Sequence, residues 1–185
     1  LDTAWREAMP MNAGVFVTEF GSSPQSAHSK LANIIAEQDN HLTGSTFWVW
    51  KETGGGWGLF DGPRKGAPAG TPNGDLRQDY VAQLSRIVPL ATVGTLNFFH
   101  YNSFLNTSRI FAMEATAPLV ESNELAVADS LVYVPSHVQL ANREVKVFGS
   151  AKLAGIDMQP DKSHVLRIAV IRNGGKYQVV VRSTE

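Results

Sequence analysis

The sequence has no cysteine among its 185 residues, and this absence excludes a disulfide scaffold, thiolate metal sites and a cysteine nucleophile. Strong charge of either sign is also lacking, since 16 Lys and Arg against 17 Asp and Glu leave a net charge of −1 at pH 7. Such a chain has no long-range field to attract nucleic acid or an anionic membrane. No apolar run approaches the roughly 18 residues that a transmembrane helix needs.

Motifs for metals and cofactors are missing as well. The five histidines stand apart without the spacing of metal ligands, so we expect no metal site. The glycine-rich stretch at residues 54–58 lacks the Lys-Ser/Thr of a phosphate loop. We therefore expect no cofactor.

The length is itself a constraint. A complete (β/α)8 barrel takes about 250 residues, so this chain is too short for one, although its apolar content suits one to two packed domains. It begins with Leu1 rather than Met, and no positively charged segment with an apolar core precedes the fold. We expect the start to be an internal cut or the product of processing.

The first half of the chain mixes strand and helix patterns. Residues 14–20 and 45–50 are short apolar runs, typical of strands buried on both faces of a parallel sheet, and a helical pattern at residues 31–38 separates them. This order predicts a βαβ unit. Two strands alone would leave a long hydrophobic edge uncovered, so this half should not fold well by itself.

The second half of the chain is strand-like. It is preceded by a loop rich in Gly, Pro, Asn and Asp. A helix at about residues 76–88, which Pro89 ends, follows that loop. From residue 93 onward we expect short strands at regular spacing, and this pattern favours a β-sandwich. The expected strands are residues 96–101, 109–114, 130–134, 144–148, 165–172 and 177–181. A Gly-rich turn at residues 173–176 predicts that the last two strands form a hairpin.

Glu19 is the main candidate for chemistry. It ends an apolar strand, where a charge is costly without a purpose or a partner. In (β/α) architectures the C-terminal strand ends hold the active site. The alternative is a glutamate that reaches solvent or pairs with a lysine, and position alone does not decide between them.

Three tryptophans are candidates for ligand contact. Trp48 and Trp50 are two residues apart and point to the same side of their strand, where an aromatic ring can form a floor under a sugar. For Trp48, deeper in the strand, core packing is favoured. Trp57 lies in a glycine-rich loop and should be partly exposed, either touching a ligand or covering a barrel mouth; the loop at 57–60 is the local candidate for an apolar ligand groove.

Two of these segments resemble consecutive strands of glycoside hydrolase family 5. Residues 14–21, with Thr-Glu-Phe-Gly at their end, resemble the seventh strand, whose Glu is the nucleophile, and residues 47–52 resemble the eighth, with its sugar-platform tryptophan. Residues 84–95 are similar to the junction of the endoglycoceramidase branch, although Ile87 and Val88 replace its Pro and Tyr. The resemblance runs from about residue 12 to the end of the chain.

This resemblance implies a fold and a division into domains. Residues 1–92 would be the C-terminal portion of a (β/α)8 TIM barrel, and residues 93–185 an immunoglobulin-like β-sandwich, so that the class is α/β plus all-β. The missing barrel strands would come from an upstream fragment of the same protein. The resemblance also implies a secreted, extracellular protein.

The resemblance implies a retaining mechanism, in which two carboxylates about 5–5.5 Å apart act as nucleophile and acid/base. Glu19 would be the nucleophile, and Trp50, Trp57 and Lys51 would bind substrate. The acid/base belongs to a segment that these residues do not contain, so the chain alone is expected to be inactive.

The leading hypothesis for function is cleavage of the β-glycosidic bond between glycan and ceramide in glycosphingolipids, with the sandwich bracing the barrel and contacting lipid surfaces. One alternative is a β-glucanase or cellulase of the same family. Another is a non-catalytic carbohydrate-binding or structural sandwich.

Overall fold

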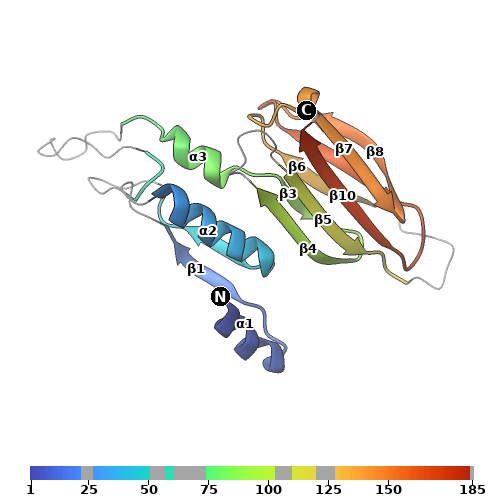
Figure 1. The fold of residues 1–185 in the computed structure, drawn as a ribbon, viewed down its shortest axis with the longest axis horizontal. Coiled ribbons are helices and arrows are strands. Elements are labelled where there is room, and N and C mark those ends of the chain that lie inside the picture. The colour runs from blue at the N-terminus through green and yellow to red at the C-terminus, as the bar shows by residue number, and fades with distance from the viewer. Residues whose placement is uncertain (22–26, 51–56, 61–73, 103–109, 120–127, 184–185) are drawn as a thin grey trace, which may run out of the picture. The chain divides into compact units, whose positions relative to one another are not determined.

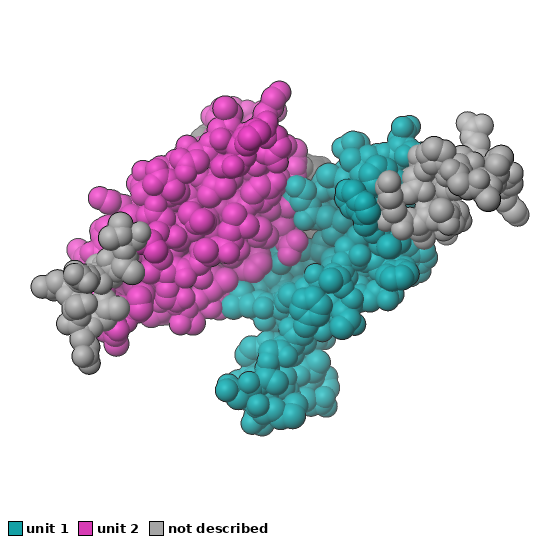
Figure 2. All heavy atoms as spheres, turned by 180° about the vertical axis from the view of Figure 1, so that it is seen from behind, with its two compact units in different colours: residues 1–85 teal, residues 86–185 magenta. Residues whose placement is uncertain are grey.

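The computed structural model describes residues 1–21, 27–50, 57–60, 74–102, 110–119 and 128–183. Its elements fall into two compact units, residues 1–85 and 86–185 (Figures 1 and 2). The sequence-based boundary after residue 92 lies later than this division, because the strand Val88–Ala91 already pairs within the second unit.

The first unit is mixed α/β. Its elements, in chain order, are α1 (Asp2–Ala8), a 3-10 turn (Met9–Met11), β1 (Phe16–Phe20), α2 (Ala27–Asn40), β2 (Gly44–Phe47) and α3 (Gln78–Leu84). Strands β1 and β2 are parallel, as expected for a βαβ unit. Both strands are shorter than their apolar runs, and α1 was not foreseen. Within the described residues the two strands form a two-stranded sheet and not a closed barrel.

A small apolar cluster holds the first unit together. Leu31 and Ile35 of α2 and Tyr80 of α3 are buried at its centre. The Phe47 ring lies 5.6 Å from that of Phe20 and 6.4 Å from that of Tyr80. The cluster therefore joins the ends of both strands to the helices.

The second unit is a sandwich of two antiparallel four-stranded sheets, in the orders β4-β5-β10-β7 and β3-β6-β9-β8. Its strands are β3 (Val88–Ala91), β4 (Thr95–Asn102), β5 (Ile110–Thr116), β6 (Asp129–Val134), β7 (Arg143–Gly149), β8 (Ala151–Met158), β9 (His164–Val170) and β10 (Lys176–Ser183), with a 3-10 turn (Leu140–Asn142) before β7. This confirms the expected series of short strands, to which β3 and β8 are added.

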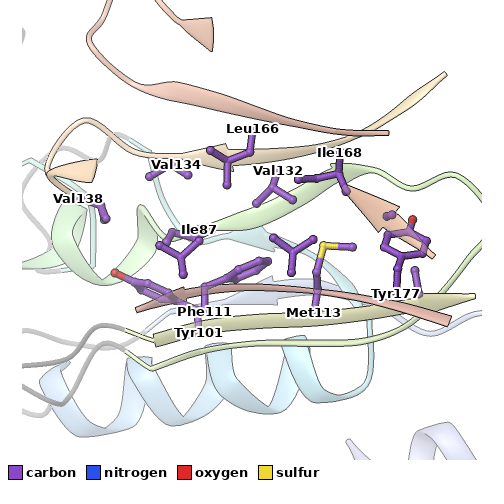
Figure 3. Close-up of a cluster of buried hydrophobic side chains, with 14 residues drawn as sticks. Ile87, Tyr101, Phe111, Met113, Val132, Val134, Val138, Leu166, Ile168 and Tyr177 are labelled. Atoms are coloured by element: carbon purple, nitrogen blue, oxygen red, sulfur yellow. The ribbon is translucent and has the colours of Figure 1, made fainter. Parts of the chain in front are cut away.

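One hydrophobic core fills the space between the two sheets (Figure 3). Alternate residues of the central strands β5, β6, β9 and β10 point into it, as the two-residue period of a strand dictates. On β5 these are Phe111, Met113 and Ala115, and on β6 Val132 and Val134. The core is thus built from both sheets at once.

The predicted hairpin of the last two strands is wrong. β9 pairs with β6 and β8, whereas β10 pairs with β5 and β7. The turn between them, with Gly174 at φ +70°, carries the chain from one sheet to the other. Leu166 of β9 and Val179 of β10 are both fully buried, and this crossover lets each face the core from its own side.

None of the helices in the described ranges has the length and apolar character to cross a membrane.

A buried hydroxyl pair links the sheets, and its removal is a first test. The Tyr177 hydroxyl lies 2.6 Å from the Ser130 hydroxyl and donates to the Val93 carbonyl at 3.0 Å. We expect Tyr177→Phe to destabilise the protein by roughly 1–3 kcal/mol, since it leaves the fully buried Ser130 hydroxyl without its Tyr177 partner. Tyr133→Phe, on the half-exposed face of β6, is the control and should cost less than about 0.5 kcal/mol. Denaturant unfolding measures both, and equal effects would contradict the assignment.

A second test concerns pH. Hydrogen bonds from Lys176, Gln178 and Asn97 lower the pKa of Glu114 from 4.5 to about 2. Because the folded pKa lies below the unfolded one, this carboxylate contributes stability above about pH 4.5 that is lost as the pH falls toward 2. Glu114→Gln should therefore flatten the loss of unfolding free energy over that range. Superimposable pH profiles of the two proteins would rule this out.

Candidate active site

Glu19 lies near the C-terminal end of β1, beside the end of β2. The Phe20 carbonyl accepts a hydrogen bond from the Trp48 backbone N–H at 2.7 Å, which ties the two strand ends together. The Glu19 side chain is exposed, and within the part of the chain that the structure describes, no hydrogen bond or ion pair engages its carboxylate. This exposure is compatible both with a catalytic carboxylate and with a glutamate that reaches solvent, two of the roles considered for Glu19 from the sequence.

The local packing of β1 explains the exposure of Glu19. Phe20 and Phe47 pack against the apolar cluster, and the Ser45 hydroxyl donates to the Gln38 side chain of α2 at 2.8 Å. The pairing of β1 with β2 shifts register between Val17 and Phe20, and Thr18 and Glu19 are both exposed there. An exposed carboxylate and the exposed Trp48 indole therefore lie at one end of this sheet.

Trp57 reaches the same end of the sheet. A Cβ placed on Gly21 would lie 2.3 Å from the Trp48 carbonyl oxygen and 3.4 Å from Cε3 of the Trp57 ring. Gly21 therefore permits the close approach of Trp48 and Trp57 two residues after Glu19. Trp57 is partly exposed, as the sequence predicted.

Trp48 does not pack in the core. Its side chain is 49% exposed, and Trp48 lies just beyond the end of β2 at Phe47. The expectation of core packing for Trp48 is therefore wrong for the described chain.

Trp50 is the most exposed of these rings, at 62%. Its one aromatic neighbour among the described residues is Phe60, at a centroid distance of 5.5 Å and an interplanar angle of 84°. The sequence placed Phe60 in a candidate loop but gave no sign of this contact, because it depends on the return of the chain to β2. The third substrate-binding candidate, Lys51, lies outside the described residues.

The residues at this end of the sheet can take part in two kinds of interaction. An exposed carboxylate can act as a nucleophile toward an electrophilic carbon, and the flat faces of aromatic rings can pack against the apolar surface of a ligand. No group of three His, Cys, Asp or Glu residues in the described ranges could hold a metal ion. The site supports carboxylate chemistry on a ligand that has apolar faces.

Comparison with known proteins gives structural matches only. No protein-family model matches the sequence, and neither does any curated protein. The chain is similar to endo-glycoceramidase II from Rhodococcus sp., solved as a lactosyl-enzyme intermediate, with a TM-score of 0.66, 17% identity and coverage of 94% of this chain and 34% of that one.

Two further solved structures are similar. An endogalactoceramidase matches with a TM-score of 0.60 and 14% identity, over 96% of this chain and 36% of that one. Sterylglucosidase 1 from Cryptococcus neoformans matches with a TM-score of 0.57 and 14% identity, over 91% and 28%. The chain thus spans about a third of the length of the chains it matches, and at these identities the likeness shows the fold: a mixed α/β part and two antiparallel sheets that resemble part of glycosidase structures.

Gly21 offers a test of how the site is assembled. We expect Gly21→Ala to destabilise the first unit, because its Cβ would meet the Trp48 carbonyl at 2.3 Å, a backbone atom that must then shift. Gly14→Ala is the matched control, since nothing lies within 4 Å of a Cβ there. Thermal unfolding followed by tryptophan fluorescence measures both. Two variants with the same midpoint would show that the close approach is unimportant.

Proposed function

We propose that this chain is the C-terminal part of a retaining glycoside hydrolase that releases the glycan from lipid-linked substrates of the glycosphingolipid type. The observation that carries this proposal is the position of Glu19, exposed near the C-terminal end of β1 and beside the exposed Trp48 at the end of β2. Catalytic groups occupy this end of the strands in (β/α) barrels.

In this proposal the first unit is the last portion of a (β/α)8 barrel, and the second an immunoglobulin-like sandwich that braces it. Strands from chain outside these 185 residues complete the barrel and supply the acid/base carboxylate. The protein is secreted, and the sandwich contributes to contact with lipid surfaces. The fold similarity over more than nine-tenths of this chain supports this arrangement.

The mechanism is a double displacement. The Glu19 carboxylate attacks the anomeric carbon while the acid/base protonates the departing glycosidic oxygen, so that a glycosyl–Glu19 ester forms and the aglycone leaves as an alcohol. Water, deprotonated by the same acid/base, then attacks the anomeric carbon and releases the sugar and free Glu19. Trp50 underlies the reacting sugar, Lys51 binds substrate, and Trp57 borders the aglycone.

The names of the similar structures favour a lipid aglycone over a polysaccharide. Each pairs a sugar with a lipid, either ceramide or a sterol. In this chain Trp57 lies on a segment that returns to the strand ends, where it can offer apolar surface to such a group.

Glu19→Gln in the full-length protein tests the proposal. We expect hydrolysis of fluorescent lactosylceramide to fall by about 10³-fold or more, because the amide cannot form the glycosyl ester. Glu7→Gln, an exposed glutamate on α1, is the control and should keep full activity. With Glu19→Gly, added azide should restore turnover and yield the α-glycosyl azide, which identifies the nucleophile.

The same assay separates the alternatives. Undiminished release by Glu19→Gln would show that Glu19 is not the nucleophile. Cleavage of soluble cellulose but not of glycolipid by the wild type would identify a β-glucanase. A wild type that cleaves neither would favour the carbohydrate-binding or structural module.

A further inference from the structure

The short segment at residues 57–60 lies between two other stretches of chain. The Leu59 N–H donates to the Val49 carbonyl at 3.1 Å, and the Leu59 carbonyl accepts from the Arg77 N–H at 2.8 Å. Phe60 also forms an antiparallel bridge with Leu76. The segment is therefore held on one side by the chain that follows β2 and on the other by the chain that leads into α3.

Neighbouring side chains of this segment have different environments. Leu59 packs against the buried cluster that contains Tyr80, whereas Phe60 meets the Trp50 ring at 5.5 Å and 84°. Edge-to-face contact of this kind is a favoured arrangement of two aromatic rings. The packing of Leu59 and the backbone hydrogen bonds thus hold the backbone from which the Phe60 ring projects.

Arg77 strengthens this support. Its guanidinium donates from Nη1 to the Gly58 carbonyl at 2.8 Å and lies 5.4 Å from the centre of the Tyr80 ring. Tyr80 is fully buried. The Arg77 side chain therefore connects Gly58, in the segment that carries Phe60, to the start of α3.

We propose that Phe60 is a positioning residue, which holds the Trp50 indole ready to stack on a sugar, and that Arg77 holds Phe60 in place. Trp50 is 62% exposed within this chain, and the edge of the Phe60 ring is the aromatic contact that its indole makes among the described residues. Ordering a mobile side chain on binding weakens affinity, and a ring fixed in advance avoids that cost. This inference rests on the proposed function, in which Trp50 is the sugar platform.

Kinetics of the full-length protein on lactosylceramide give the first test. We expect Phe60→Ala to raise KM about 2- to 10-fold with kcat changed less than about twofold, because a platform contact is present in both ground and transition states. Phe60→Tyr keeps the ring edge and should restore the wild-type KM. Phe98→Ala, a partly exposed phenylalanine of the second unit, is the control and should leave both constants unchanged.

A double-mutant cycle then asks whether Phe60 acts through Trp50. In a Trp50→Ala background, Phe60→Ala should have no further effect on KM. An equal rise in both backgrounds would mean that Phe60 contacts the sugar itself, and would overturn the proposal.

A spectroscopic test is independent of activity. With 5-fluorotryptophan in place of every tryptophan of the full-length protein, the fluorine resonance of Trp50 is assigned by its loss in Trp50→Phe. Phe60→Ala should shift and broaden the Trp50 resonance, whereas Phe60→Tyr should leave the resonance near its wild-type position. Arg77→Lys removes the planar guanidinium and should shift the Trp50 resonance as Phe60→Ala does. An unchanged Trp50 resonance in Phe60→Ala overturns the proposal, and an unchanged one in Arg77→Lys removes the role of Arg77.

These measurements also separate the two proposals. If the wild type cleaves no glycoside but the Trp50 resonance responds to Phe60, the proposed function has failed while the positioning of Trp50 stands. If cleavage depends on Glu19 but neither KM nor the resonance responds to Phe60, the reverse holds.

Discussion

The parallel pairing of β1 and β2 is the constraint on which the candidate site depends. The Phe20 carbonyl accepts the Trp48 N–H, and this bond holds the two strand ends together. Phe20 and Phe47 pack against the apolar cluster, while the register shift between Val17 and Phe20 leaves both Thr18 and Glu19 exposed. The Glu19 carboxylate and the Trp48 ring are therefore both exposed at the same end of this sheet.

The second unit shows how a sandwich obtains one core from strands that are distant in sequence. Its sheets interleave early and late strands, so that β10, at the end of the chain, lies between β5 and β7. The Tyr177 hydroxyl then bridges to Ser130 and to Val93. Such non-local pairing implies slow folding compared with helical proteins, because long loops must close before the contacts form.

Much of the strand pattern was readable from sequence, because alternating burial leaves a clear signal. β3 and β8 were missed for separate reasons. β3 contains Pro89, which indicates a helix stop, yet proline is tolerated in strands at a sheet edge, and β3 is at one. β8 carries Ala and Gly in place of the β-branched residues that mark strands.

The candidate site divides in the same way. Glu19 and the exposure of Trp57 followed from local patterns, whereas the Trp50–Phe60 contact depends on where residues 57–60 return, and no local signal encodes that. The prediction of a hairpin between the last two strands was wrong because a glycine-rich turn indicates only that the chain changes direction. It does not indicate which sheet the next strand joins.

The bulge in β8 has a consequence for the behaviour of the protein in concentrated solution. β8 lies at the end of its sheet, and its pairing with β9 is interrupted between Leu153 and Gly155. A flat, regular strand with exposed Leu153 and Ile156 would be a template on which strands of other molecules could grow. The irregularity, together with the charges of Lys152 and Asp157, makes that edge a poor template, and so protects the sandwich against association into fibrils.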